Sequence, residues 1–173
     1  CASSECVFTW TPRADEAHPE VVLRTDEPIV ALIRCDWCIG ALHASGASWL
    51  RSGAPDAGES PSRLEGPTSC VACVHDAFVV GDFLGALHVF TEPVVAPVVA
   101  NTTMTQARRM RCDMGEAVLA VDISRTLLVG AGLSSLRLWT REGALVGTIS
   151  RHTGVGVVLV ADDGLTLCEL SDR

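Results

Sequence analysis

The stretch Ala117–Ser150 contains four short apolar segments that are separated by tight turns. Val118–Ile123 alternates with the two-residue period of a β-strand. Thr126–Val129 is a compact apolar run that stops at a Gly-Ala-Gly turn, which is typical of a strand buried on both faces. Ser135–Thr140 and Ala144–Ser150 follow as two further strands. A meander of four antiparallel strands cannot bury both faces alone, so this stretch needs neighbouring sheets.

The same pattern recurs along the chain about every 40 residues. The third strand of each copy ends in an aromatic residue, and these residues are Trp10, Trp49, Phe90 and Trp139. They are 39, 41 and 49 positions apart. The spacing predicts repeat units at about residues 1–25, 26–68, 69–102, 107–150 and 151–173, with the first and last units incomplete.

The most complete repeat resembles a blade of the WD-repeat β-propeller family. A Leu-Val-Gly-Ala-Gly segment is followed by Leu-Arg-Leu-Trp, which places Trp139 where that family has its closing Trp. Thr140 replaces the usual Asp, and no Gly-His pair precedes Val118. The turn Asp of the family would fall near Leu133, and in the preceding repeat Asp82 lies two positions from its expected place. The resemblance implies an all-β fold of four-stranded propeller blades, with most of the family's polar network absent.

The connections between the strands differ in length and composition. Residues 52–67 are rich in Gly, Pro, Ser and acidic residues, and we predict a mobile, exposed loop around a weak outer strand. Residues 92–100 contain two prolines and are expected to form the outer strand of the third repeat, since proline suits only an edge. Residues 101–111 are expected to be a polar connection that lengthens the repeat before Trp139.

The number of repeats predicts a partial propeller. Propellers close with roughly four to eight blades, and about four repeats are too few for the usual WD-repeat ring. We expect either an excerpt or isoform of a longer propeller, which the start at Cys1 rather than Met also suggests, or a minimal ring closed by its two incomplete end blades. An open array would leave sheet faces and edges unpaired.

The charge of the chain disfavours several kinds of partner. The net charge is −8, whereas nucleic-acid binding needs clustered positive charge, so nucleic acid is not expected as a partner. The one basic cluster is Arg108, Arg109 and Arg111, and we interpret it as a solvated edge rather than an anion site. Apolar runs are far shorter than the roughly 18 residues of a membrane span, and no secretory segment is evident. A cytoplasmic or nuclear protein is therefore expected.

Eight cysteines provide the main alternative. Cys35 and Cys38 form one CxxC pair, Cys70 and Cys73 form a second, and His75 follows closely, so a zinc or redox site is conceivable. Cys35 and Cys38 bracket a turn and could converge, but Cys70 and Cys73 lie three apart in a strand and point to opposite faces. Reduced, buried thiols fit this pattern better, and they indicate a reducing compartment.

No catalytic constellation stands out in the sequence. None of the five histidines lies in a recognisable nucleophile motif, and the short Gly motifs lack the helix that a phosphate cradle needs. Asp122 and Arg137 lie in neighbouring predicted strands and could form a structural ion pair. We therefore predict that the chain is not an enzyme and needs no cofactor.

These observations favour a non-enzymatic scaffold or adaptor for protein–protein interactions, acting as a subunit of a larger assembly. Rigid sheets would present variable loops to protein partners. The alternative is a small zinc- or redox-active protein that uses the two CxxC pairs.

Overall fold

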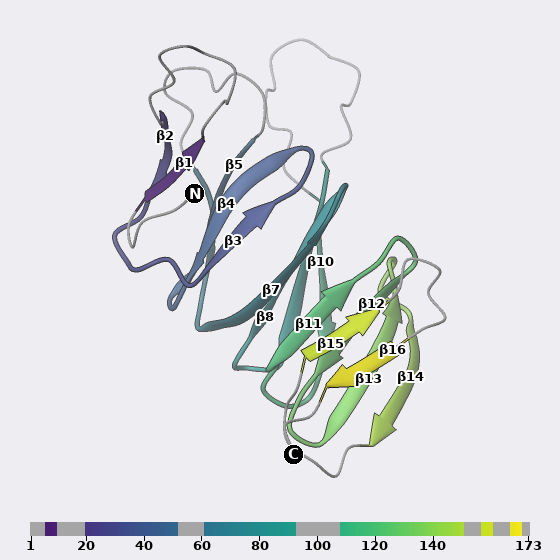
Figure 1. The fold of residues 1–173 in the computed structure, drawn as a ribbon. Helices are drawn as coiled ribbons and strands as arrows, with labels where there is room; N and C mark the ends of the chain where they lie inside the picture. Colours follow the sequence, from purple (N-terminus) through teal and green to yellow (C-terminus); the bar gives the residue numbers. More distant parts are fainter. Residues whose placement is uncertain are drawn as a thin grey trace.

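The computed structural model describes residues 6–9, 20–51, 61–92, 108–150, 157–160 and 167–170. This part of the chain consists of β-strands and turns and contains no helix. All strand pairs are antiparallel, and the sheets follow one another across Figure 1 from the β1–β2 pair to the β15–β16 pair. The all-β fold of four-stranded antiparallel blades that the sequence predicted is confirmed.

Three sheets have four strands each and are here called blades I, II and III. Blade I comprises β3 (Ala31–Arg34), β4 (Cys38–His43), β5 (Gly46–Arg51) and β6 (Ser62–Glu65). Blade II comprises β7 (Thr68–Val74), β8 (Ala77–Asp82), β9 (Ala86–Thr91) and β10 (Arg108–Asp113). Blade III comprises β11 (Ala120–Ile123), β12 (Leu127–Ala131), β13 (Ser135–Thr140) and β14 (Leu145–Ser150).

Two further sheets have only two strands each. They are β1 (Cys6–Thr9) with β2 (Glu20–Arg24), and β15 (Val157–Val160) with β16 (Leu167–Leu170). β15 packs against the first two strands of blade III, just as β11 packs against the first two strands of blade II. β15 and β16 therefore occupy the first and second positions of a blade. β1 and β2 directly precede blade I and pack against β4 and β5, so they occupy third and fourth positions.

The outer strand of blade II differs from its predicted position. β10, rather than residues 92–100, pairs with β9, with Arg109 opposite Phe90 and Asp113 opposite Ala86. Residues 93–107 lie outside the described residues. We predicted a polar connection at residues 101–111 and a boundary between repeat units at residues 102–107. Both predictions are wrong for residues 108–113, because these residues form the outer strand of blade II. The basic residues concealed a strand in which exposed Arg109 and Arg111 alternate with the more buried Met110 and Cys112.

The loop predicted at 52–67 contains a strand at its end. β6 pairs with β5 as the outer strand of blade I, while residues 52–60 lie outside the described residues. Leu64 is the buried residue of this short strand. A single inward-facing leucine among polar neighbours explains why the strand signal was weak in the sequence.

Apolar layers between the blades form the core. The layer between blades I and II, here called layer I/II, contains the aromatic rings of Trp37, Trp49, Phe78 and Phe90. The layer between blades II and III, here called layer II/III, contains Trp139 among aliphatic residues, methionine and cysteine. Trp49, Phe90 and Trp139, which lie close to the ends of the third strands, are only 6%, 4% and 4% exposed. The corresponding Trp10 lies outside the described residues.

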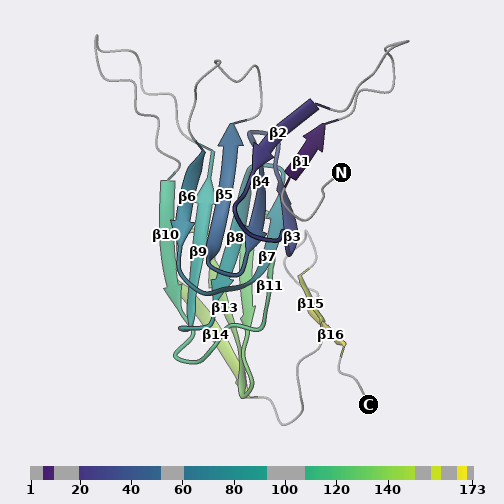
Figure 2. The same cartoon turned by 90° about the vertical axis from the view of Figure 1, so that its left-hand side faces the viewer.

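The strands of the complete blades run up and down along one common direction (Figure 2), so the turns collect at two opposite faces. One face carries the turns between the second and third strands of each blade, and the connections between blades lie at the same face. Backbone hydrogen bonds link the two sets of loops: the Gly66 N–H donates to the Ser45 carbonyl, and the Phe83 N–H donates to the Pro67 carbonyl. We call this face the turn-tip face. The other face carries the remaining turns within blades and is called the opposite face.

Candidate interaction surface

A carboxylate holds the turn between the second and third strands of each complete blade. These carboxylates belong to Glu27 for blade I, Asp82 for blade II and Glu116 for blade III. Each accepts a hydrogen bond from a backbone N–H of its turn, and the donors are Ser45, Leu84 and Ser134. A turn exposes backbone donors that the sheet cannot satisfy, so these carboxylates fix the loops of the turn-tip face.

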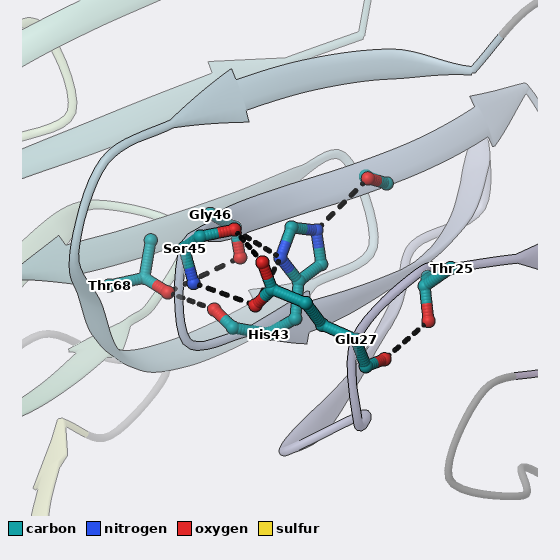
Figure 3. Close-up of polar contacts among 7 residues, drawn as sticks. Thr25, Glu27, His43, Ser45, Gly46 and Thr68 are labelled. Atoms are coloured by element: carbon teal, nitrogen blue, oxygen red, sulfur yellow. Dashed lines mark hydrogen bonds and ion pairs between the residues drawn. The ribbon is translucent and has the colours of Figure 1, made fainter.

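In blade I, Glu27 lies before the first strand and reaches the turn after the second (Figure 3). Its Oε1 accepts a 2.5 Å hydrogen bond from the Ser45 hydroxyl, and its Oε2 lies 3.7 Å from His43 Nδ1. Thr68 at the start of blade II donates to the carbonyl of His43 at 2.6 Å. The Ser45 hydroxyl is the main cause that holds the pKa of Glu27 below its ordinary value. The network thus joins two blades at their turns.

The same network has a hydroxyl, an imidazole and a carboxylate in the order of a catalytic relay. His43 Nε2 lies 3.1 Å from the Ser48 hydroxyl, and His43 Nδ1 faces Glu27. Ser48, however, is only 3% exposed, and the open hollow beside this network is lined by His43 and Ser45 but not by Ser48. The Ser48 hydroxyl is thus buried beneath the turn, and the hydrogen bonds of this group are suited to holding the turn.

In blade III, Glu116 repeats the role of Glu27. Its carboxylate accepts from the backbone N–H and the hydroxyl of Ser134, each at 3.0 Å, and from the Ser135 hydroxyl at 2.5 Å. Burial alone raises the pKa of Glu116, but these hydrogen bonds outweigh it and leave the pKa lowered. Glu27 and Glu116 both precede their turn serines by 18 positions. That shared spacing is the signal by which the sequence could have predicted both caps.

In blade II, the carboxylate comes from the turn itself. Asp82 accepts from the backbone N–H groups of Leu84 and Ala86 at 2.9 and 2.8 Å, and it lies 2.8 Å from His88 Nε2. Arg109 donates to His88 Nδ1 at 2.8 Å, so the neutral imidazole donates its Nε2–H to Asp82. Asp82, His88 and Arg109 thus form a polar network at this turn, although the sequence predicted that most of the polar network of the WD-repeat family is absent. A turn Asp two positions from its expected place still performs the capping role.

The pKa values of His88 and Asp82 in this hydrogen-bonded network are both lowered. Burial is the main cause that lowers the pKa of His88, and the nearby positive charge of Arg109 adds to it. Burial raises the pKa of Asp82, but hydrogen bonds from Ala86 and His88 outweigh it and leave the pKa lowered. The neutral imidazole and the ionised carboxylate are therefore the favoured forms of the folded chain.

Three large apolar side chains project from two turns of the turn-tip face. Phe83 and Leu84 are 54% and 76% exposed, and Leu133 is 67% exposed. The turns are neighbours, because Gly85 of one and Gly132 of the other both lie against Glu116. Exposed apolar side chains that gather on adjacent turns are a common feature of protein-binding surfaces. We define these three residues as the apolar turn-tip patch.

The opposite face carries polar contacts between blades. Trp37 donates its Nε1–H to the Asp76 carbonyl at 3.0 Å, and the Asp76 carboxylate pairs with Arg141 at 2.9 Å. Asp36 lies 3.4 Å from His75 Nδ1, with both side chains exposed. An open groove of about 870 Å³ runs along these turns and is lined in part by Asp36, His75 and Asp76. Its charges largely cancel, so this groove has no marked preference for a ligand.

Of the two predicted cysteine pairs, Cys35 and Cys38 both lie in layer I/II, whereas the second pair is divided between the two layers. Cys70 packs in layer II/III and Cys73 in layer I/II, as expected from their opposite faces. The hydrogen bond between the Cys35 and Cys38 thiols is the main cause that raises the pKa of Cys35 to about 12; burial adds to the effect, and the contact with the Cys73 thiol opposes it. All four are free thiols. Among the described residues no group of three or more His, Cys, Asp or Glu side chains is arranged to hold a metal ion.

The predicted pair of Asp122 and Arg137 does not form. β12 lies between their strands, β11 and β13. Asp122 instead accepts from the backbone N–H of Val160 in β15 at 2.6 Å, and Arg137 donates to the Asp113 carbonyl at 3.1 Å. Each side chain thus links blade III to its neighbour on one side, which the sequence concealed because it does not show strand order.

The fold is similar to that of solved β-propeller proteins. Hsv2 of Kluyveromyces lactis aligns with 98% of this chain at 14% identity and a TM-score of 0.66, and the alignment covers 55% of Hsv2. Hsv2 of Kluyveromyces marxianus aligns with 98% at 15% identity and a TM-score of 0.63, again over 55% of its length. The chain therefore spans about half the length of these structures. At such identity the likeness shows the fold alone, which is that of a partial β-propeller.

Comparison with known sequences adds no family. No family model matches the chain, and a search of curated proteins found no match. In the part of the chain that the structure describes, no helix has the length and apolar character to cross a membrane.

Proposed function

We propose that this chain is a non-enzymatic scaffold or adaptor that binds other proteins as a subunit of a larger assembly. The observation that carries the proposal is the apolar turn-tip patch of Phe83, Leu84 and Leu133. Its side chains are exposed on turns that carboxylates hold in place. The WD-repeat resemblance of the sequence supports the same class of function.

The patch is suited to binding because its geometry is fixed before a partner arrives. Asp82 holds the turn of Phe83 and Leu84 through two backbone N–H groups, and Glu116 holds the turn of Leu133 through serine contacts. A loop that is already ordered loses little conformational freedom on binding, so more of the buried apolar area contributes to affinity. A complementary apolar surface on a partner protein is the expected ligand.

The reducing environment expected for such an adaptor agrees with its thiols. The described cysteines Cys35, Cys38, Cys70, Cys73 and Cys112 are all free. We therefore propose that the chain acts in the cytoplasm or the nucleus, where thiols stay reduced.

The test is a quantitative affinity capture from extracts of the source cells. The double variant Leu84→Ser, Leu133→Ser should lose the partners that the unmodified chain retains, because it removes most of the exposed apolar area of the patch. Val146→Ser is the matched control, since Val146 is 59% exposed on β14 and lies outside the patch. Thermal unfolding of all three chains shows that the fold is kept. Equal partner recovery by the double variant would contradict the proposal.

A further inference from the structure

The turn-tip face and the opposite face differ in the partners of their acidic side chains. On the opposite face, the Asp76 carboxylate pairs with Arg141 at 2.9 Å. Arg34 and Arg125 line the groove of that face together with Asp36, so acidic and basic side chains offset each other there. Beside the apolar turn-tip patch, by contrast, carboxylates bond to neutral groups and the negative charge is retained.

Two of these carboxylates hold the turns of the patch. Glu116 accepts hydrogen bonds from the backbone N–H and the hydroxyl of Ser134 and from the hydroxyl of Ser135, which are all uncharged donors. Asp82 accepts from two backbone N–H groups and from the neutral imidazole of His88. Burial raises the pKa of both carboxyl groups, but these bonds outweigh it and leave each pKa lowered. Both groups are therefore negatively charged at neutral pH.

A third carboxylate, that of Asp113, is exposed beside the patch. Asp113 is the last residue of β10, and the next residue, Met114, donates its backbone N–H to the Gly85 carbonyl at 2.7 Å, in the turn that carries Leu84. Asp113 Oδ1 accepts from the backbone N–H of Gly115 at 2.9 Å. Its second oxygen, Oδ2, has no hydrogen-bond partner among the described residues, so it is available to a cationic side chain. We call Asp82, Asp113 and Glu116 the rim carboxylates.

Two basic side chains lie near Asp113 but form no ion pair with it. Arg137 donates to the backbone carbonyl of Asp113 at 3.1 Å, and Arg111 lies two residues before Asp113 in β10. Within the described residues, neither guanidinium pairs with the carboxylate of Asp113 or of Glu116. Two guanidinium groups against the three rim carboxylates leave the surroundings of the patch negative, in a chain whose net charge is −8.

We propose that the apolar turn-tip patch binds a basic segment of a partner protein, in which large apolar side chains are flanked by arginine or lysine. The apolar side chains of the segment cover Phe83, Leu84 and Leu133, and its cationic groups lie against the rim carboxylates. A nucleic acid, or a second copy of this acidic chain, would instead bring like charges together, which opposes binding. This inference rests on the proposed scaffold function and adds the chemistry of the partner.

The apolar and charged parts of this surface contribute to binding in different ways. Attraction between opposite charges speeds the encounter of the two proteins, whereas buried apolar area slows their dissociation. One exposed ion pair adds at most about fivefold to an affinity. The apolar patch is therefore the main source of affinity, and the rim carboxylates select basic segments among apolar ones.

The first experiment determines the chemistry of the partner with three libraries of displayed peptides. Every peptide has a randomised core of large apolar residues, and the flanking residues are arginine in the first library, serine in the second and glutamate in the third. The immobilised chain should enrich arginine-flanked peptides, which should bind at least about tenfold more tightly than the same cores with glutamate flanks. Raising the salt concentration from about 0.05 to 0.5 M should reduce this difference, because salt screens exposed charges.

The double variant Leu84→Ser, Leu133→Ser shows whether the selected peptides bind at the patch. It keeps the rim carboxylates and removes two of the exposed apolar side chains, so the affinity for a selected peptide should fall at least about tenfold. Equal binding to the double variant would overturn the inference. So would enrichment of serine-flanked or glutamate-flanked peptides in place of arginine-flanked ones, or a failure of all three libraries.

The second experiment measures the contribution of one rim carboxylate. Asp113→Asn removes the charge but keeps a side-chain oxygen that accepts from the Gly115 N–H. The affinity for an arginine-flanked peptide should fall about fivefold, whereas the affinity for the same core with serine flanks should not change. Asp36→Asn is the matched control, since Asp36 is an exposed carboxylate on the opposite face. If Asp113→Asn binds the arginine-flanked peptide as tightly as Asp36→Asn does, the rim carboxylates do not select the partner and the inference fails.

The outcomes separate this inference from the scaffold function on which it rests. Serine-flanked or glutamate-flanked peptides that bind the unmodified chain but not the double variant would leave the patch as a protein-binding surface and remove only the basic partner. Failure of every library, together with unchanged partner recovery by the double variant, would remove both.

Discussion

The two layers between complete blades solve the same packing problem with different side chains. Layer I/II is built around stacked and tilted rings, with Phe78 between Trp37 at 5.8 Å, Trp49 at 5.2 Å and Phe90 at 4.7 Å. Layer II/III has Trp139 as its aromatic residue among the described ones and fills the rest with aliphatic side chains and methionine. A propeller therefore needs a filled layer between blades rather than a fixed set of residues. The two layers should nevertheless respond differently when a ring is removed.

Phe78→Ala should have the largest effect on stability. The side chain has no exposed surface and touches three rings that are rigid and cannot move into the space. We expect a loss of about 4–5 kcal/mol in the free energy of unfolding, at the upper end for a deleted core aromatic. Urea unfolding measures it, and Phe83→Ala in the exposed patch is the control with little effect. A loss as small as that of the control would mean that layer I/II does not hold the blades together.

Trp139→Ala should cost less, about 3 kcal/mol, although the ring is larger. Trp139 is 4% exposed, but Met110 and Met114 belong to the same layer and can change rotamer to fill part of the cavity. Double variants with Met114→Leu test this explanation, because a stiffer side chain should increase the cost of Trp139→Ala. If Trp139→Ala lowers the free energy of unfolding by more than Phe78→Ala in the same urea assay, layer II/III tolerates the loss of a ring less well than layer I/II, which would contradict this explanation.

A pH dependence should distinguish the layers further. His88 lies on the same face of blade II as Phe90, so its network with Asp82 borders layer I/II. Burial lowers the pKa of His88 in the folded chain, so the unfolded chain takes up the proton first and stability falls as pH drops below about 6.5. The lowered pKa of Asp82 extends the loss to more acidic pH. His88→Gln should remove the decline near pH 6.5 in thermal unfolding, and an unchanged pH profile would contradict it.

The sequence was sufficient to predict the blades but not their polar links. Alternation of apolar residues predicted the strands of blade III, because each strand there is continuous in sequence and bounded by turn residues. The strand β10 was not predicted, because its arginine residues suggested a loop. It is a strand because it pairs with β9, which places Met110 and Cys112 on its more buried face. No local pattern indicates that a distant strand will need an outer partner.

The candidate surface was less predictable than the fold. Phe83, Leu84 and Leu133 are ordinary turn residues in sequence, and they become a patch only because Glu116 lies against both turns. Trp37 lies in the turn that Cys35 and Cys38 bracket, although its ring packs in the core of layer I/II. Both outcomes depend on contacts between blades, and such contacts have no signature within one repeat.

Trp37→Phe is expected to give the smallest measurable effect, and it tests whether layer I/II depends on polar as well as ring contacts. Phenylalanine keeps most of the ring area against Phe78 but removes the Nε1–H that donates to the Asp76 carbonyl at 3.0 Å. The loss should be about 1 kcal/mol, the usual net value of one hydrogen bond. Urea unfolding of Trp37→Phe beside Trp37→Ala separates the two contributions. If Trp37→Phe costs as much as Trp37→Ala, the hydrogen bond across the blades, rather than the stacking, is the main contact by which this ring joins blade I to blade II.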